Sequence, residues 1–153
     1  MSDSVNRLLP IEKSISYLTD VLDGGADPNE VDEYGRNALS RAAQEGCRPP
    51  LLQRVLARIH DVNAGDNNGW TALMYAALNN HLDVVISLMN HPGIGVNVQN
   101  RYTNYTALHT AANNHPAIVS QLLSDDNINA NLKDKWNDTP LKVAIDSNHH
   151  ECV

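Results

Sequence analysis

Apolar and polar positions alternate with a helical period that recurs along most of the chain. In the first of two helical stretches of each unit, a Leu is followed three and four positions later by small residues, as in Leu73 with Ala76 and Ala77. In the second stretch, apolar side chains recur at the same spacing, as in Val84 and Leu88. Both spacings place the apolar side chains on one helix face. The pattern predicts paired helices at residues 38–46 and 49–59, 72–79 and 82–90, and 107–114 and 116–124.

Residues typical of helix starts and breaks bound these stretches. A Thr or Asn precedes each first helix, where its side-chain oxygen can accept a hydrogen bond from a free backbone N–H. Pro140 fits the first helical position, where its missing donor costs nothing. Polar or glycine-containing pairs, such as Glu45-Gly46, separate the two helices of a unit. No helical pair can cover its own apolar face, so we expect neighbouring pairs to stack. The predicted capping residues are Asn37, Thr71, Thr106 and Thr139.

A period of 34 residues joins these units. It relates three histidines, His81, His115 and His149, and four asparagines, each followed three positions later by an acidic or amide residue. A fixed period of this size indicates a stack of one supersecondary unit rather than a single globular core. Stacked repeats are mostly surfaces that bind other proteins. The periodic pairs are Asn29 and Asp32, Asn63 and Asp66, Asn97 and Asn100, and Asn131 and Asp134.

Composition narrows the class of partner. The chain has 153 residues, 42% of them hydrophobic and 19% charged, which suits one folded domain. Its net charge of −7 and pI of about 5.3 make nucleic acid and anionic membranes poor partners. No apolar run approaches the ~18–20 residues that span a bilayer, and the first residues lack the build of a signal peptide. With two cysteines in no motif, the sequence predicts a cytoplasmic protein without membrane insertion.

Candidate chemistry is weak by comparison. The run His149-His150-Glu151-Cys152 suggests a metal site, but neighbouring residues on a helix point about 100° apart and do not converge on one ion. His149 is also an ordinary repeat position. Cys47 lies beside Arg48 without a base to activate it, so we expect an ordinary thiol. We therefore predict no catalytic residue, no cofactor and no metal, and a protein that is not an enzyme.

Several of these motifs together resemble the ankyrin repeat. The family pattern, roughly Asp-x-x-Gly-x-Thr-Pro-Leu-His-x-Ala-Ala with a later Gly-Ala-Asp-x-Asn, is matched at residues 66–73, 106–112 and 25–29. The resemblance covers about residues 15 to 153. It implies an all-α fold, a solenoid of stacked helix-turn-helix units with β-turn fingers. It also implies that His109 makes a structural hydrogen bond near the turn.

The resemblance predicts one ankyrin repeat domain over residues 1–153. The chain departs from the pattern in the unit 100–133, which has one extra residue in its finger and lacks one before His115. The N-terminal unit could form a helix pair, 3–9 and 11–23. The chain stops where the last second helix should begin, so we expect the natural protein to continue, with a terminal half-repeat as the alternative. The expected divisions are a capping unit at 1–31, repeats at 32–65, 66–99 and 100–133, and an incomplete repeat at 134–153.

Aromatic residues gather where the resemblance places the fingers. Five of the seven aromatics lie in the loops between repeats, and Trp and Tyr dominate binding hot spots. The alternative is that some rings pack on adjacent fingers and only stiffen the array. The family's concave face consists of fingers and first helices. The predicted protein-binding residues there are Tyr34, Arg36, Asn67, Asn68, Trp70, Leu78, Asn79, Arg101, Tyr102, Tyr105, Asn113, Lys135 and Trp136.

These observations favour a monomeric, non-enzymatic scaffold that binds another protein through this concave face. The basic groups beside the aromatics suggest a partner with apolar anchors and some acidic character. One version is a secreted effector of an intracellular bacterium, acting in host-cell cytoplasm, because such repeats are common there. The alternatives are a substrate-targeting segment of a larger enzyme with its catalytic domain beyond Val153, and a purely structural spacer.

Overall fold

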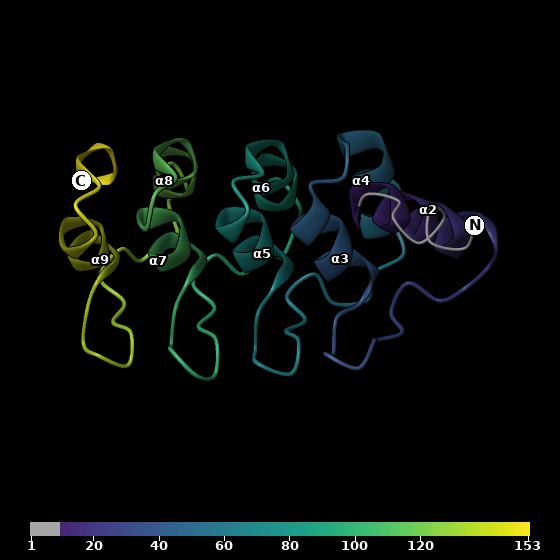
Figure 1. Ribbon diagram of the computed structural model, residues 1–153, viewed down its shortest axis with the longest axis horizontal. Helices are drawn as coiled ribbons and strands as arrows, with labels where there is room; N and C mark the ends of the chain where they lie inside the picture. The colour runs from purple at the N-terminus through teal and green to yellow at the C-terminus, as the bar shows by residue number, and fades with distance from the viewer. Residues whose placement is uncertain (1–9) are drawn as a thin grey trace, which may run out of the picture.

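The computed structural model describes residues 10–153, which form a row of stacked helical pairs (Figure 1). Within those residues the secondary structure is helical, so the all-α prediction is confirmed. The stack runs from α2 at the N-terminal end to α9 and η1 at the C-terminal end. The elements are α2 (Pro10–Asp23), α3 (Ala38–Glu45), α4 (Pro49–Leu56), α5 (Ala72–Leu78), α6 (Leu82–Met89), α7 (Ala107–Ala112), α8 (Pro116–Leu123), α9 (Pro140–Asp146) and η1 (His150–Cys152).

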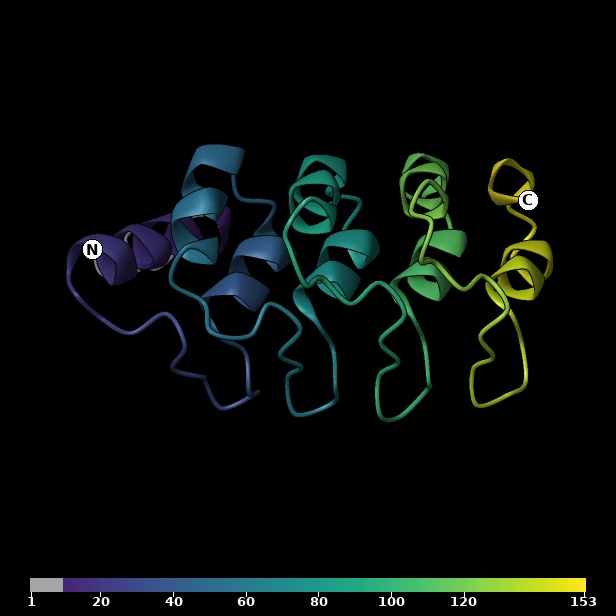
Figure 2. The same ribbon diagram turned by 180° about the vertical axis from the view of Figure 1, so that it is seen from behind.

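The helices form two rows, and loops extend from one side of the first row (Figures 1 and 2). One row holds the first helices α3, α5, α7 and α9, and the other holds α4, α6, α8 and η1. Strong contacts join each helix to its partner within a unit or to the corresponding helix of the next unit. This is the stacked helix-turn-helix solenoid that the sequence predicts.

Side-chain caps begin the first helices as expected. The side-chain oxygens of Asn37, Thr71, Thr106 and Thr139 each accept from the backbone N–H three residues later, at 3.0–3.4 Å. In three of the units, the chain turns from the first helix to the second through a residue with a left-handed backbone conformation. Gly46 (φ 76°) serves the first, and Asn80 and Asn148 (both φ 59°) serve others, because the short Asn side chain tolerates this conformation.

The predicted helix ends differ from the observed ones by a few residues. α4 ends at Leu56 rather than at residue 59, and α7 ends at Ala112 rather than 114. α7 is shorter because its unit lacks one residue before His115, whose backbone N–H closes the turn onto the Ala111 carbonyl at 2.8 Å. At the N-terminus, α2 begins at Pro10 and accounts for the predicted helix 11–23. The predicted helix 3–9 lies outside the described residues.

Small residues allow the first row to pack closely. The alanine pairs of α3, α5 and α7 are buried, with no more than 2% of any side chain exposed, and the contacts between these helices are the densest in the fold. Second-row leucines, such as Leu88 and Leu122, are fully buried beside them. Burying one such side chain stabilises the fold by about 1.5–3 kcal/mol. The core is therefore continuous along the stack and not divided among separate units.

The periodic asparagines join each unit to the next. The side chain of Asn63 donates to the Gly93 carbonyl at 2.8 Å and accepts from the Gly95 N–H at 2.6 Å. Asn29 makes the same pair of hydrogen bonds with the backbone of residues 58 and 60. Asn97 makes them with the backbone of residues 127 and 129. We call this two-bond contact the asparagine clamp. It explains the period, because the amide satisfies two backbone groups of the following loop at once.

The periodic histidines join each unit to the preceding one. Nε2 of His81 lies 3.1 Å from the Gln44 carbonyl oxygen, and Nε2 of His115 lies 3.1 Å from that of Leu78. A carbonyl can only accept, so Nε2 of each ring holds the proton. Each ring therefore satisfies a carbonyl near the end of a first helix, where no intrahelical partner is left.

Candidate protein-binding face

The four loops that extend from the first helices are the fingers. We number them in chain order as finger 1 (residues 32–36), finger 2 (66–70), finger 3 (100–105) and finger 4 (134–138). The acidic residue that begins each of fingers 1, 2 and 4 accepts backbone hydrogen bonds from the residues two and four positions later. In finger 3, Asn100 instead accepts from the N–H and the hydroxyl of Thr103. A carboxylate or amide thus fixes each finger from within, and it is buried in fingers 2, 3 and 4.

Neighbouring fingers are also joined to one another. The N–H of Asn67 donates to the Tyr34 carbonyl at 3.0 Å, and the N–H of Arg101 donates to the Asn68 carbonyl at 3.0 Å. The N–H of Lys135 donates to the Thr103 carbonyl at 2.9 Å. One backbone bond per junction therefore holds the fingers side by side (Figure 1).

The fingertips place three aromatic rings in solvent. Tyr34, Tyr102 and Trp136 occupy equivalent positions, two residues after the first residue of their fingers, and are 58%, 66% and 57% exposed. Asn68 is the exposed fourth member of this row. Of the other predicted binding residues, Asn67, Arg101 and Lys135 are also exposed on the fingers.

Trp70 and Tyr105 do not project from the fingertips. Trp70 is half-buried against the core, with its ring centroid 5.7 Å from that of Tyr75 on α5. Tyr105 stacks on His109, with centroids 5.3 Å apart, and meets Trp136 at 6.2 Å in an edge-to-face contact. Both residues directly precede a helix cap, so their side chains return toward the first helices. Tyr105 thus contacts the adjacent finger, as the alternative for the aromatics describes, whereas Trp70 packs within its own unit.

Arg36 is also engaged within the chain. Its Nη2 and Nε lie 2.8 and 2.9 Å from the Asp32 carboxylate, and its Nη1 donates to the Gln44 side chain at 2.9 Å. The guanidinium carbon lies 4.8 Å from the Tyr34 ring centroid. Burial opposes ionisation of Asp32, but the hydrogen bonds from Arg36 and the finger backbone hold the pKa of Asp32 below its ordinary value. In finger 1, the charge of Arg36 is therefore satisfied within the finger, by the Asp32 carboxylate and the Tyr34 ring.

The remaining predicted residues lie at the ends of first helices. Leu78 and Asn79 are exposed at the end of α5, and Asn113 follows α7. Asn79 donates to the carbonyl of Tyr75, and Asn113 accepts from the Ser147 hydroxyl at 3.1 Å. Leu78 therefore adds apolar surface beside two amides.

His109 has the structural role that the resemblance implies. Nδ1 accepts from the Thr106 N–H at 3.2 Å, which leaves the proton on Nε2, and Nε2 donates to the Asp138 carbonyl at 3.0 Å. The side chain is fully buried, and burial lowers its pKa. His109 thereby connects α7 to finger 4.

Two hollows open between fingers and first helices, and polar surface predominates in the first. The first, about 310 Å³, includes Tyr75, which the sequence analysis did not select. The Tyr75 hydroxyl donates a hydrogen bond to the Asp66 carboxylate. The pKa of Tyr75 is raised, chiefly because the hydroxyl is buried and also because of this hydrogen bond. The second hollow, about 300 Å³, is lined by Tyr105, Asp134, Trp136, Asp138, Val143, Asp146 and Ser147.

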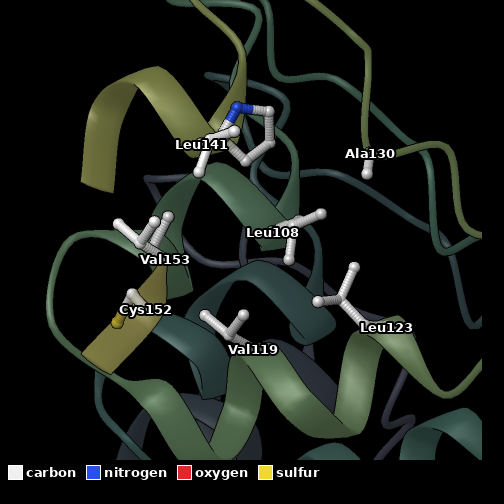
Figure 3. Close-up of a pocket in the computed structure, with 9 residues that line it drawn as sticks. Leu108, Val119, Leu123, Ala130, Leu141, Cys152 and Val153 are labelled. Atoms are coloured by element: carbon white, nitrogen blue, oxygen red, sulfur yellow. The ribbon is translucent and has the colours of Figure 1, made fainter. Parts of the chain in front are cut away.

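An apolar groove of about 200 Å³ lies at the C-terminal end of the stack (Figure 3). Leu108, Val119 and Leu123 come from α7 and α8, and Leu141 and Cys152 come from α9 and η1. Its lining includes no finger residue, so the groove belongs to the stacking interface rather than to the candidate face.

Other candidate chemistry is limited. Within residues 10–153, no three metal-binding side chains converge, and no helix is long and apolar enough to cross a membrane. Cys47 is buried, and burial together with the charge of Asp83 raises its pKa to about 11. Its thiol is therefore protonated at neutral pH.

The stacked pairs, the fingers and the exposed row of side chains define a helical repeat protein of the solenoid class. The chain belongs to the ankyrin repeat family, whose model for ankyrin repeats (3 copies) matches residues 3–100 and 92–153. The photoreceptor ankyrin repeat protein of Homo sapiens is 37% identical over 79 residues, covering 50% of this chain and 18% of that protein. Ankyrin repeat and SOCS box protein 6 of Mus musculus is 47% identical over 53 residues, covering 34% and 13%. The matches thus span less than a fifth of either relative.

Proposed function

We propose that this chain binds a partner protein through the face formed by its fingers and first helices. Ankyrin repeats are generally protein-interaction modules, and their proteins are typically non-enzymatic. The observation that supports this face most strongly is the exposure of Tyr34, Tyr102 and Trp136 at equivalent fingertip positions. Aromatic rings bury a large area at low entropic cost when a partner covers them. Exposed apolar side chains gathered on one face of a protein commonly mark a binding site.

The half-buried aromatic residues of the face act as supports in this proposal. Trp70 and Tyr105 fix the fingers against α5 and α7 through ring contacts. The backbone bonds between fingers, and the carboxylates inside them, hold the exposed rings before binding. A preorganised surface loses less entropy on association. Leu78, Asn79, Asn113, Asn67, Asn68, Arg101 and Lys135 surround the rings with hydrogen-bonding groups and apolar surface.

The finer aspects of function stay predictions. The effector role rests on the resemblance alone, and the role as a targeting segment of a larger enzyme stays a prediction. The cytoplasmic location and the monomeric state rest on composition. The binding face is the part of the proposal that named side chains support.

Affinity capture with the intact chain, followed by a direct affinity measurement on the captured protein, tests this proposal. Tyr34→Ala, Tyr102→Ala and Trp136→Ala should each weaken binding about thirtyfold, since a lost hot-spot aromatic typically costs about 2 kcal/mol. Ile86→Ala is the matched control, because Ile86 is an exposed apolar residue on α6 in the other helix row. Unchanged affinity in all three fingertip variants, with weakened binding in Ile86→Ala, would assign binding to the face formed by the second helices instead.

A further inference from the structure

Finger 1 holds an arginine in a site of three parts. The guanidinium of Arg36 lies over the Tyr34 ring, pairs with the Asp32 carboxylate and donates to the Gln44 side chain. An aromatic face attracts a cation through its quadrupole, and a planar guanidinium can stack on a ring while its N–H groups reach a carboxylate. Finger 1 therefore shows how this repeat binds a guanidinium group.

Finger 4 repeats this site without the arginine. Three repeat periods further along the chain, Trp136 corresponds to Tyr34, Asp134 to Asp32 and Asp146 to Gln44. The finger backbone is held in the same way, since Asp134 accepts from the N–H groups of Trp136 and Asp138 at 2.8 and 2.9 Å. The difference is that Asp138 stands at the position of Arg36.

The other two fingers lack one component each. Finger 2 has Asn68 at the fingertip position, so no exposed ring stands over its Asp66. Finger 3 has Tyr102 at the fingertip, but Asn100 replaces the carboxylate. Among the four fingers, the combination of a fingertip ring and an internal carboxylate occurs in fingers 1 and 4.

We propose that the hollow at finger 4 binds an arginine side chain of the partner protein, in the place that Arg36 takes in finger 1. This inference rests on the proposed binding face. The hollow of about 300 Å³ is lined by the Trp136 and Tyr105 rings and by Asp134, Asp138 and Asp146. The Trp136 and Tyr105 rings meet at 67°, so they form a corner against which a planar group can stack.

The charges around the hollow favour a cation. The Asp138 carboxylate makes no ion pair within residues 10–153, whereas Asp146 pairs with Lys142 at 2.5 Å. Burial raises the pKa of the Tyr105 hydroxyl, and the charges of Asp134 and Asp138 raise it further, which shows that both carboxylates act on this ring. Nζ of Lys135 lies 4.5 Å from the Trp136 ring centroid, so this ring already attracts one cation.

This arrangement alters the expected partner chemistry. The sequence suggested a partner with some acidic character because Arg36, Arg101 and Lys135 flank the aromatic row. In the structure, Asp32 neutralises Arg36 and Lys142 neutralises Asp146. Asp134 and Asp138 line the hollow beside Trp136 and make no ion pair within residues 10–153. At finger 4 the partner therefore supplies a positive charge.

Titration of the intact chain with N-acetyl-arginine amide, followed by amide and indole N–H signals in NMR, tests the site. We expect saturable shifts at the Trp136 indole and the Asp138 amide, and none at the Trp70 indole. N-acetyl-citrulline amide has nearly the same shape without the charge and should bind about tenfold more weakly, because the charge-assisted contacts are lost. Equal binding of the citrulline analogue, or shifts confined to other residues, would overturn the assignment.

A variant that supplies the arginine within the chain gives a second test. Asp138→Arg should reproduce finger 1 and abolish the Trp136 shift, while the far-UV circular dichroism stays helical. Asp126→Arg makes the same charge change at an exposed loop residue and should keep the affinity within about twofold. Wild-type binding by Asp138→Arg would exclude this hollow. If partner capture depends on Tyr34 and Tyr102 but arginine amide shifts nothing at Trp136, the arginine site is wrong and the binding face stands.

Discussion

The side chain of Asn97 holds the backbone of Asn129, 32 residues further along the chain. Oδ1 accepts from the Asn129 N–H at 2.8 Å, while Nδ2 donates to the carbonyl of Asn127 at 2.8 Å. One side chain therefore joins two successive loops of the stack. Asn131 occupies the next equivalent position, and its side chain makes no hydrogen bond within the described residues.

This contrast predicts a difference in stability. Asn97→Ala removes two hydrogen bonds between units, each worth about 0.5–1.5 kcal/mol, so the free energy of unfolding should fall by about 1–3 kcal/mol. Asn131→Ala should change it by less than about 0.5 kcal/mol. Urea denaturation of both variants measures the difference. Equal losses would show that the asparagine clamp adds nothing beyond local loop structure.

His109 should make stability depend on pH. Its folded-state pKa lies below the ordinary value of 6.5, chiefly because it is buried, so the unfolded state binds the proton more readily. The stability from neutral His109 is therefore fully present above about pH 6.5 and is lost as the pH falls through the lower folded-state pKa. The free energy of unfolding should fall more for the wild type than for His109→Gln between pH 7.5 and pH 5. Parallel pH curves for the two proteins would contradict this role.

Trp70 and Trp136 should respond differently to removal. Trp70 packs on the core, so Trp70→Ala should cost about 2 kcal/mol and lower the melting temperature by roughly 4–8 °C. Trp136 is mostly exposed, so Trp136→Ala should lower it by only about 1–2 °C. Differential scanning calorimetry compares them. If Trp136→Ala proved the more destabilising variant, its ring would be a structural support rather than a contact residue.

Gly46 should tolerate substitution less well than Gly25. Both have a left-handed backbone, with φ of 76° and 77°, so an alanine costs about 1–2 kcal/mol at either position. A Cβ at Gly46 would also lie 2.5 Å from the His81 ring, whereas at Gly25 nothing lies within 4 Å. Gly46→Ala should displace His81 from the Gln44 carbonyl and cost about 1 kcal/mol more than Gly25→Ala. Chemical denaturation and the His81 ring signals in NMR test both consequences.

The helical pairs were predictable because their signals are local. The caps at Asn37, Thr71, Thr106 and Thr139 and the apolar spacing depend on residues within one or two turns. The period also revealed the stacking, although the two bonds of each asparagine clamp join residues that only the fold brings together.

The exposure of the aromatics was harder to predict, because it depends on the direction of the chain within a finger. Tyr34, Tyr102 and Trp136 are each two residues beyond the first residue of a finger and are exposed. Trp70 and Tyr105 lie on the return to the helix and are half-buried. The distance of each aromatic from the first residue of its finger would have distinguished the exposed group from the half-buried group in the sequence. The site at finger 4 required the observed contacts of Arg36 in finger 1.

The clamp also constrains how such a chain can change in length during evolution. Finger 3 has gained one residue and the unit has lost one before His115, so Asn97 and Asn131 remain 34 apart. An uncompensated insertion of one residue between two periodic asparagines would shift one clamp relative to the next. Gain or loss of an entire unit would leave every surviving junction in register. We therefore expect single-residue changes in this lineage to arise in cancelling pairs, and array length to vary by duplication of whole units.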